Sequence, residues 1–223
     1  MLGKPVIVVN VKCYEEATGE NLNRIIDAIN VSSREYGVSA AIAVQPADIF
    51  HAKMASRVPV LAQHVDPIIF GGHTGYVLPE SVKFSGASGS LVNHAEHQIE
   101  LWAIDNIIKR LRKLELSQIV CTNNDDASGA AAALDPDFVA FEPPELIGGD
   151  ISVSTAQPDL VGRSVEKVKR ISERTGVLCG AGIKNAKDVS KAIELGCDGV
   201  LLASGIVKAR DVYKACDEIF RGV

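Results

Sequence analysis

One glutamate, Glu142, ends an apolar run in the stretch FEPPELIGGD, residues 141–150. A carboxyl group at the rim of an apolar core has its pKa raised by desolvation, which suits it to proton abstraction near neutral pH. The two prolines that follow stiffen the chain, whereas the two later glycines permit a bend. We therefore expect Glu142 to act as a general base and residues 145–148 to form a short lid, although a plain surface loop would show the same pattern.

Asn10 ends the apolar run PVIVVN, and Val11 and Lys12 follow it. Alternation along a strand places Asn10 and Lys12 on one side, where both can converge on one ligand. Lys12 would then supply a fixed positive charge. A turn asparagine followed by a surface lysine is the simpler interpretation of this segment when it is taken alone.

His94 closes the run GSLVNH and precedes Glu96 and an amphipathic stripe that predicts a helix. The positive end of a helix dipole disfavours the charged imidazolium, so we expect a neutral ring. A neutral imidazole can donate a hydrogen bond to a carbonyl group, although a capping or core histidine is the alternative. The remaining histidines are interpreted as structural or exposed: His51, His64, His73 and His97.

Two loops of small residues, GAG at 180–182 and ASG at 203–205, suit anion binding. Small residues let backbone N–H groups approach an anion closely, and a helix that starts after each loop adds a favourable dipole. Glycines at strand ends also serve tight turns, so a single loop of this kind would say little. Together the two loops predict a phosphate site.

The sequence contains eight apolar runs of strand length, and these candidate residues lie in the runs or directly after them. The runs are residues 5–10, 40–45, 59–64, 89–94, 118–122, 137–142, 176–182 and 199–204. The runs do not alternate apolar with polar residues, which is typical of parallel strands covered on both faces. Most spacers carry helical periodicity, as in Leu22, Ile25, Ile26 and Ile29. We expect an α/β fold, a single closed (β/α)₈ barrel over residues 1–223, with a doubly wound open sheet as the alternative.

In such a barrel the active site lies at the C-terminal ends of the strands. The candidate residues come from the first, fourth, sixth, seventh and eighth runs, so this fold would bring them to one mouth. The longest irregular connection, residues 64–90, exceeds the usual loop length. We expect it either to tuck under the barrel or to contact another subunit.

The composition argues against several classes of protein. With 223 residues, 47% hydrophobic and 23% charged, the chain is typical of a soluble globular protein. A formal net charge of −5 argues against nucleic acid as a partner. The cysteines form no C-x-x-C pair and no metal-ligand spacing, which favours a reducing cytoplasm and no metal. No run of about 18 apolar residues predicts a membrane span.

Five motifs resemble, in family order, those of the triosephosphate isomerases. They are NVK at 10–12, NHAE at 93–96, FEPPELIG at 141–148, GAG at 180–182 and ASG at 203–205. The resemblance covers essentially the whole chain, whose brevity is similar to that of the compact archaeal branch. It implies a TIM barrel that interconverts dihydroxyacetone phosphate and glyceraldehyde 3-phosphate in glycolysis and gluconeogenesis without a cofactor. It also implies self-association, as a dimer generally and as a tetramer in the compact branch.

The resemblance implies catalytic roles for four residues and a supporting role for a fifth. Glu142 would move the proton between two substrate carbons, and His94 would polarise the carbonyl group. Lys12 would stabilise negative charge on the substrate and on the enediolate, and Asn10 would hold the substrate oxygens. Glu96 resembles a supporting carboxylate of the family.

Substrate binding and subunit contact are implied for further residues. The substrate-binding set is Asn10, Val11, Lys12, Ile147, Gly182, Ala203 and Ser204, with Ile147 acting through its backbone N–H. Thr74 resembles a threonine that reaches the neighbouring subunit's site. The chain departs from the family's pattern at Ala95, His97 and Gln98, at Gly149 and Asp150, and at Tyr76.

Two other functions remain open on the sequence alone. A noncatalytic sugar-phosphate-binding barrel would need the two anion loops but neither Glu142 nor His94. The other is another phosphate-binding barrel isomerase or an aldolase, for instance one that uses Lys12 as a Schiff base.

Overall fold

The structure, a computed structural model, describes residues 2–143 and 153–223. Within these residues, eight parallel strands close into a barrel in sequence order, with the first strand paired to the last. The strands are β1 (Val6–Asn10), β2 (Ser39–Val44), β3 (Val60–Ala62), β4 (Gly89–Val92), β5 (Ser117–Thr122), β6 (Phe138–Phe141), β7 (Gly176–Gly180) and β8 (Gly199–Leu202). The predicted (β/α)₈ barrel is therefore confirmed, and the open sheet is excluded.

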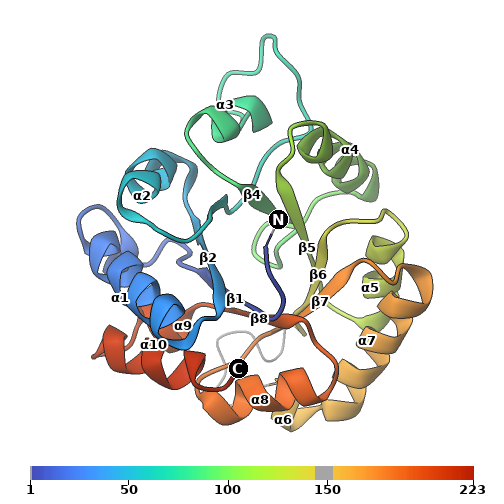
Figure 1. The fold of residues 1–223 in the computed structure, drawn as a ribbon. Helices are drawn as coiled ribbons and strands as arrows, with labels where there is room; N and C mark the ends of the chain where they lie inside the picture. Colours follow the sequence, from blue (N-terminus) through green and yellow to red (C-terminus); the bar gives the residue numbers. More distant parts are fainter. Residues whose placement is uncertain (1, 144–152) are drawn as a thin grey trace.

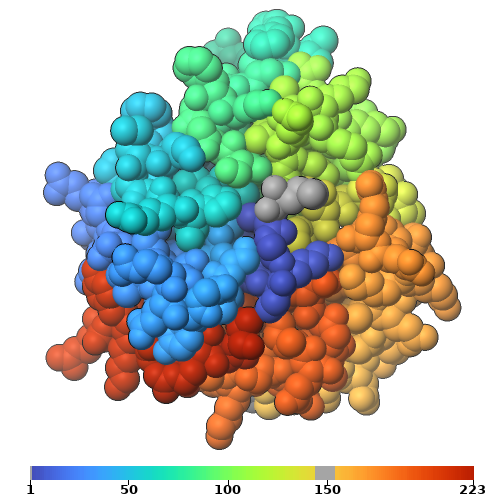
Figure 2. All heavy atoms as spheres, in the orientation of Figure 1, coloured from blue at the N-terminus to red at the C-terminus, as the bar shows by residue number. Residues whose placement is uncertain are grey.

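Helices form a ring around the barrel, as the view along the barrel in Figure 1 shows. They are α1 (Asn21–Tyr36), α2 (Ile49–Ala55), α3 (Pro79–Phe84), α4 (Leu101–Lys113), α5 (Asp125–Ala132), α6 (Val153–Ala156), α7 (Pro158–Ile171), α8 (Ala186–Glu194), α9 (Ser204–Val207) and α10 (Val212–Phe220). Short 3₁₀ turns, η1 (Glu15–Ala17) and η2 (Pro46–Asp48), precede α1 and α2. In Figure 2 the blue N-terminal residues lie across the middle of the same face.

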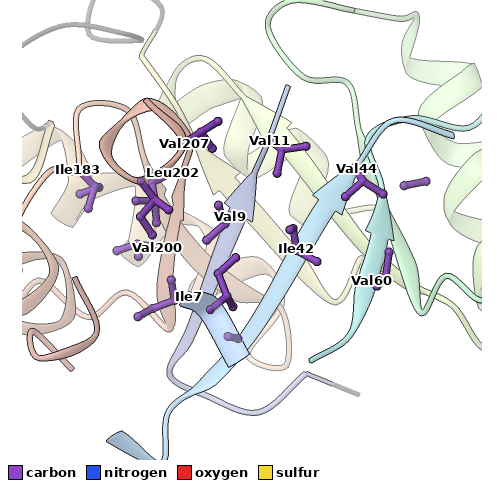
Figure 3. Close-up of a cluster of buried hydrophobic side chains, with 14 of the residues drawn as sticks. Ile7, Val9, Val11, Ile42, Val44, Val60, Ile183, Val200, Leu202 and Val207 are labelled. Carbon is purple, nitrogen blue, oxygen red and sulfur yellow. The ribbon is translucent and has the colours of Figure 1, made fainter. Parts of the chain in front are cut away.

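Alternating strand residues build two apolar layers, because successive side chains of a strand point to opposite faces. Val6, Val8, Ile119 and Leu178 belong to one buried cluster, which includes inward-facing residues of the barrel strands. The other cluster joins the outer face of the strands to the helices, and Figure 3 shows part of it, including Ile7, Val9, Val11, Ile42 and Val44. Side chains that are packed on both faces fix the strands, and the strands in turn fix the residues at their ends.

Two local expectations need correction. Residues 64–90 are not one irregular connection, because they contain the helix α3 and the first two residues of β4. The part of this connection before α3 projects outward, at the top of Figure 1. The helix expected directly after His94 begins only at Leu101, so a turn rather than a helix follows the histidine.

None of the helices among the described residues combines the length and the apolar character that crossing a bilayer requires.

Candidate active site

A pocket of about 450 Å³, counted with its open mouth, lies at the C-terminal ends of the strands. Its lining residues come from β1, β6, β7 and β8 and the loops at their C-terminal ends, and from the turn after β4: Asn10, Lys12, Tyr14, His94, Glu142, Ala181, Gly182, Ile183, Lys184, Leu201, Leu202, Ala203 and Ser204. Segments that are far apart in the sequence therefore share one cavity.

Glu142 lies immediately after β6, and its side chain is almost fully buried at 6% exposure. Its backbone N–H donates to the carbonyl oxygen of Thr122 on β5, which continues the sheet by one residue and fixes the base. Burial raises the pKa of Glu142 above its usual value, against the opposing effects of His94, Cys121 and Lys12. Desolvation disfavours the carboxylate, so the group is a stronger base than an exposed glutamate.

One oxygen of Glu142 is positioned for proton transfer. Oε2 is buried and has no hydrogen-bond partner among the described residues. It lies 3.7 Å from Nε2 of His94, across the pocket that both residues line. A buried oxygen without a partner is costly in a folded protein, and this one belongs to a residue that lines the pocket, where a substrate could supply the partner.

His94 is held in one orientation by the turn that follows it. The backbone N–H of Glu96 donates to Nδ1 of His94 at 3.2 Å. A ring nitrogen that accepts a hydrogen bond carries no proton, so the neutral tautomer with its proton on Nε2 fits this geometry. Nε2 of His94 lies on the side of the ring that faces Glu142 in the pocket.

Lys12 is one of two lysines that line the pocket, with Lys184, and its backbone is held in an unusual conformation. Its φ of 52° lies in the left-handed region, which non-glycine residues rarely adopt. The backbone N–H of Lys12 donates to Oδ1 of Asn10, and its carbonyl oxygen accepts from Nε2 of Gln63. Nζ lies 2.8 Å from Oε1 of Glu96, in an ion pair that aims the ammonium group.

The loops after β7 and β8 lie against each other in the anion half of the pocket. Ala181 and Gly182 have φ of 71° and 72°, so two successive residues are left-handed. A Cβ on Gly205 would lie 2.7 Å from the carbonyl oxygen of Ile183, so this close approach requires glycine. Backbone N–H groups of both loops can therefore face one anion.

Gly180 leaves room for the side chain of Glu142. A Cβ at this position, the last residue of β7, would lie 2.3 Å from Cγ of Glu142. No side chain fits there without moving the glutamate, so Gly180 is a requirement of the site rather than of a turn.

Several predicted site residues lie elsewhere. Val11 is buried in the layer between strands and helices and does not line the pocket. Thr74 is exposed on the projecting connection before α3. Glu96 acts on the pocket through Lys12 and His94. Ile147, Gly149, Asp150 and the expected lid at 145–148 lie outside the described residues.

Sequence reasoning missed four residues that shape the pocket: Tyr14, Gln63, Cys121 and Lys184. Cys121 stands in an apolar strand and looks like core, yet its inward position two residues after Ile119 places it beside Glu142. Strand alternation could have identified it. The role of Gln63 cannot be recognised from the sequence, because it depends on the fold, which brings the residue after β3 close to Lys12.

A second hollow adjoins the first. It measures about 1160 Å³ with its open mouth and shares Asn10, Lys12, Tyr14 and His94 with the first pocket. The imidazoles of His64 and His97, which were interpreted as structural or exposed, stack in its wall with ring centroids 4.1 Å apart. The described residues contain no cluster of metal-ligating side chains.

Known proteins match this chain over most of its length. A model of the triosephosphate isomerase family matches residues 5–219. A triosephosphate isomerase of Methanothermus fervidus is 50% identical over 198 residues, which cover 89% of this chain and 89% of that protein. A triosephosphate isomerase of Methanobacterium bryantii is 49% identical over 195 residues, which cover 87% and 86% of the two chains.

Proposed function

Because the chain belongs to the triosephosphate isomerase family, we propose that its pocket interconverts dihydroxyacetone phosphate and D-glyceraldehyde 3-phosphate. The chain is an aldose-ketose isomerase. The roles that follow are assigned to its residues from their contacts and burial.

Glu142 and His94 carry out the proton transfers. Oε2 of Glu142 takes a proton from the carbon that bears the hydroxyl group, while Nε2–H of His94 donates to the carbonyl oxygen of the neighbouring carbon. The electron pair of the broken C–H bond forms the double bond of an enediol or enediolate. The same Glu142 returns a proton to the adjacent carbon. The original hydroxyl group gives up its O–H proton as its carbon becomes the carbonyl carbon, which replaces the proton that His94 donated, and the electrons stay within the substrate.

Lys12 stabilises the negative charge that develops on the substrate oxygens. A preorganised cation in a pocket that excludes water stabilises such charge more than the same cation in water does. Asn10 holds the backbone of Lys12 and lines the pocket, where its amide group contacts a substrate oxygen.

The phosphate group lies against the loops after β7 and β8. Backbone N–H groups of Gly182, Ala203 and Ser204 donate to its oxygens, with Ile147 proposed as a further N–H donor. Binding energy from the phosphate, which does not react, holds the reacting carbons between Glu142 and His94.

The observation that carries this function is the buried oxygen Oε2 of Glu142, which has no partner among the described residues and faces His94 in the pocket that Lys12 also lines. The test is a coupled assay on glyceraldehyde 3-phosphate, with the product formed in deuterated water analysed for exchange. We expect turnover and deuterium on the carbon that receives the proton. Turnover without deuterium incorporation would argue for direct hydride transfer instead of a base.

Neither alternative function gains support from these contacts. A binding protein has no use for a buried carboxylate without a partner opposite a histidine. An aldolase would form a Schiff base on Lys12, so trapping with borohydride in the presence of substrate distinguishes it. We expect no adduct.

We further propose that the protein associates with copies of itself in the cytoplasm, as a dimer or a tetramer. The connection before α3 exposes large apolar side chains, with Ile69 62%, Phe70 71% and Tyr76 59% accessible. The hollow beside the active site offers a neighbouring subunit's Thr74 segment a place to bind. An apolar segment and a large adjacent hollow on one chain suit an interface between copies.

A further inference from the structure

Asp188 is a buried carboxylate near the start of α8, with 7% of its surface exposed. Its Oδ2 accepts a hydrogen bond from the backbone N–H of Lys184 at 3.0 Å. Its Oδ1 accepts from the hydroxyl group of Thr155 at 3.3 Å, and its carbonyl oxygen accepts from the hydroxyl group of Ser154 at 3.0 Å. One residue thus connects the loop after β7 to the helix α6.

The loop that Asp188 holds is the one with two left-handed residues, Ala181 and Gly182. An alanine in this conformation is disfavoured, and such backbone persists only where the surrounding structure fixes it. The strand β7 fixes the beginning of the loop. The bond from Lys184 N–H to Asp188 fixes its end.

A shift of this loop would also affect the neighbouring loop after β8. Ile183 is buried at 2% exposure, and its carbonyl oxygen lies so close to Gly205 that a Cβ there would be at 2.7 Å. The loop after β8 therefore packs directly on the loop after β7. A displacement of the first loop toward Gly205 would therefore push on the second loop, which carries backbone N–H groups of the same site.

We propose that Asp188 is a positioning residue for the phosphate group of the substrate. Its carboxylate holds residues 181–184 in the conformation in which the N–H groups of this loop and of residues 203–205 converge on one anion. The inference rests on the proposed function, because it assigns Asp188 to the same phosphate site. Asp188 itself does not line the pocket, so it acts through the loop.

A purely structural role for Asp188 makes a different prediction. Asn185 caps α8, since its Oδ1 accepts from the backbone N–H of Asp188 at 3.1 Å. A carboxylate in the first turn is favourable to a helix in any protein. If Asp188 served only the helix, its loss would lower the melting temperature and leave the affinity for phosphate ligands unchanged.

The experiment measures the Kd of glycerol 3-phosphate, an unreactive analogue, by calorimetry, together with KM and kcat. We expect Asp188→Ala to raise Kd and KM about tenfold and to change kcat less, because it removes the carboxylate that accepts the Lys184 N–H and holds the loop. Asp188→Asn keeps an oxygen that can accept this N–H, so its Kd should stay within about threefold of the wild type. Asn185→Ala is the matched control, because it removes the cap of the same helix and keeps the Lys184 bond.

The Asn185→Ala variant should melt at a lower temperature, with a Kd within about twofold of the wild type. An unchanged Kd in Asp188→Ala, or an equal rise in Asn185→Ala, would overturn the proposal. Should Asp188→Ala not fold, Asp188→Ser replaces it, because serine keeps a polar group at the helix start but is too short to reach the Lys184 N–H.

Turnover of glyceraldehyde 3-phosphate by the wild type tests the proposed function separately. An inactive wild type contradicts that function. An active wild type whose Asp188 variants bind normally contradicts only the role of Asp188.

Discussion

Glu142 combines two properties that a general base needs and that oppose each other. It must be buried enough to be strongly basic, yet it must be ionised before it can take a proton. Burial raises the pKa of Glu142, while His94, the Cys121 thiol and Lys12 lower it. The thiol of Cys121 is itself held protonated, because burial raises its pKa well above the usual value. It can therefore donate to the carboxylate throughout the neutral range.

Replacement of Glu142 by glutamine keeps the shape of the side chain and removes the base. We expect Glu142→Gln to lower kcat by about 10²- to 10⁴-fold, the usual contribution of a positioned base, with KM changed only a few-fold. Steady-state kinetics on glyceraldehyde 3-phosphate measures both. Glu173→Gln, which makes the same change at an exposed position, should behave as the wild type. A kcat close to normal in Glu142→Gln would remove this residue from the mechanism.

The pH dependence follows from the pKa of Glu142. The ionised form is active, so kcat/KM falls as the pH drops through this pKa, and burial places that fall above the range of an exposed glutamate. The Cys121 thiol lowers the pKa of Glu142, so Cys121→Ala should move the acid limb of the profile to higher pH.

The control for this shift is Cys216→Ala, a buried cysteine on α10 that lies outside the pocket. Profiles of kcat/KM against pH compare the two variants with the wild type. An acid limb that moves to lower pH in Cys121→Ala, or that moves equally in both variants, contradicts the proposed contact.

Among the helices and strands, those with strong patterns were predictable. All eight strands lie within or close to the apolar runs, because a strand covered on both faces has to be apolar throughout. The helix α3 was missed since six residues are too few to show a periodic stripe, although Pro79 at its start is a recognised signal. The start of α4 was placed too early because residues 96–98 are polar and fit a first helical turn as well as a loop.

The sequence identified the site residues whose own side chains carry out the proposed chemistry. It did not identify the roles of the residues that hold those side chains in place. Glu142, His94 and Lys12 stand out as polar groups after apolar runs. Gln63, Gly180 and Asp188 act through backbone contacts and spacing between neighbouring elements, which a single sequence does not display.

The contact between β7 and the end of β6 gives a test of this spacing. Gly180→Ala would place a methyl group 2.3 Å from Cγ of Glu142, so the base has to move. A misplacement of about 1 Å can cost about 10²-fold in rate, so we expect kcat to fall by at least about tenfold while the Kd of glycerol 3-phosphate changes little. Gly162→Ala on α7 is the control, because a Cβ there meets nothing within 4 Å. Normal turnover by Gly180→Ala would show that the pocket tolerates the shift.

For the molecule as a whole, the exposed connection before α3 should govern self-association. Phe70 is 71% exposed there, and Phe70→Asp would place a charge in the proposed interface. We expect light scattering to show a dimer or tetramer for the wild type and a smaller mass for the variant at the same concentration. A wild type that is monomeric at working concentration would exclude the proposed interface.

The pairing of β1 with β8 has a consequence for how activity arises during folding. Asn10 and Ser204 line the same pocket from opposite ends of the chain. A nascent chain still lacking its last strand therefore has half a phosphate cradle and no enclosed base, however many of its helices have formed. In a refolding experiment, recovered turnover should lag behind the far-ultraviolet circular dichroism signal. The length of that lag would measure how long after helix formation β1 pairs with β8.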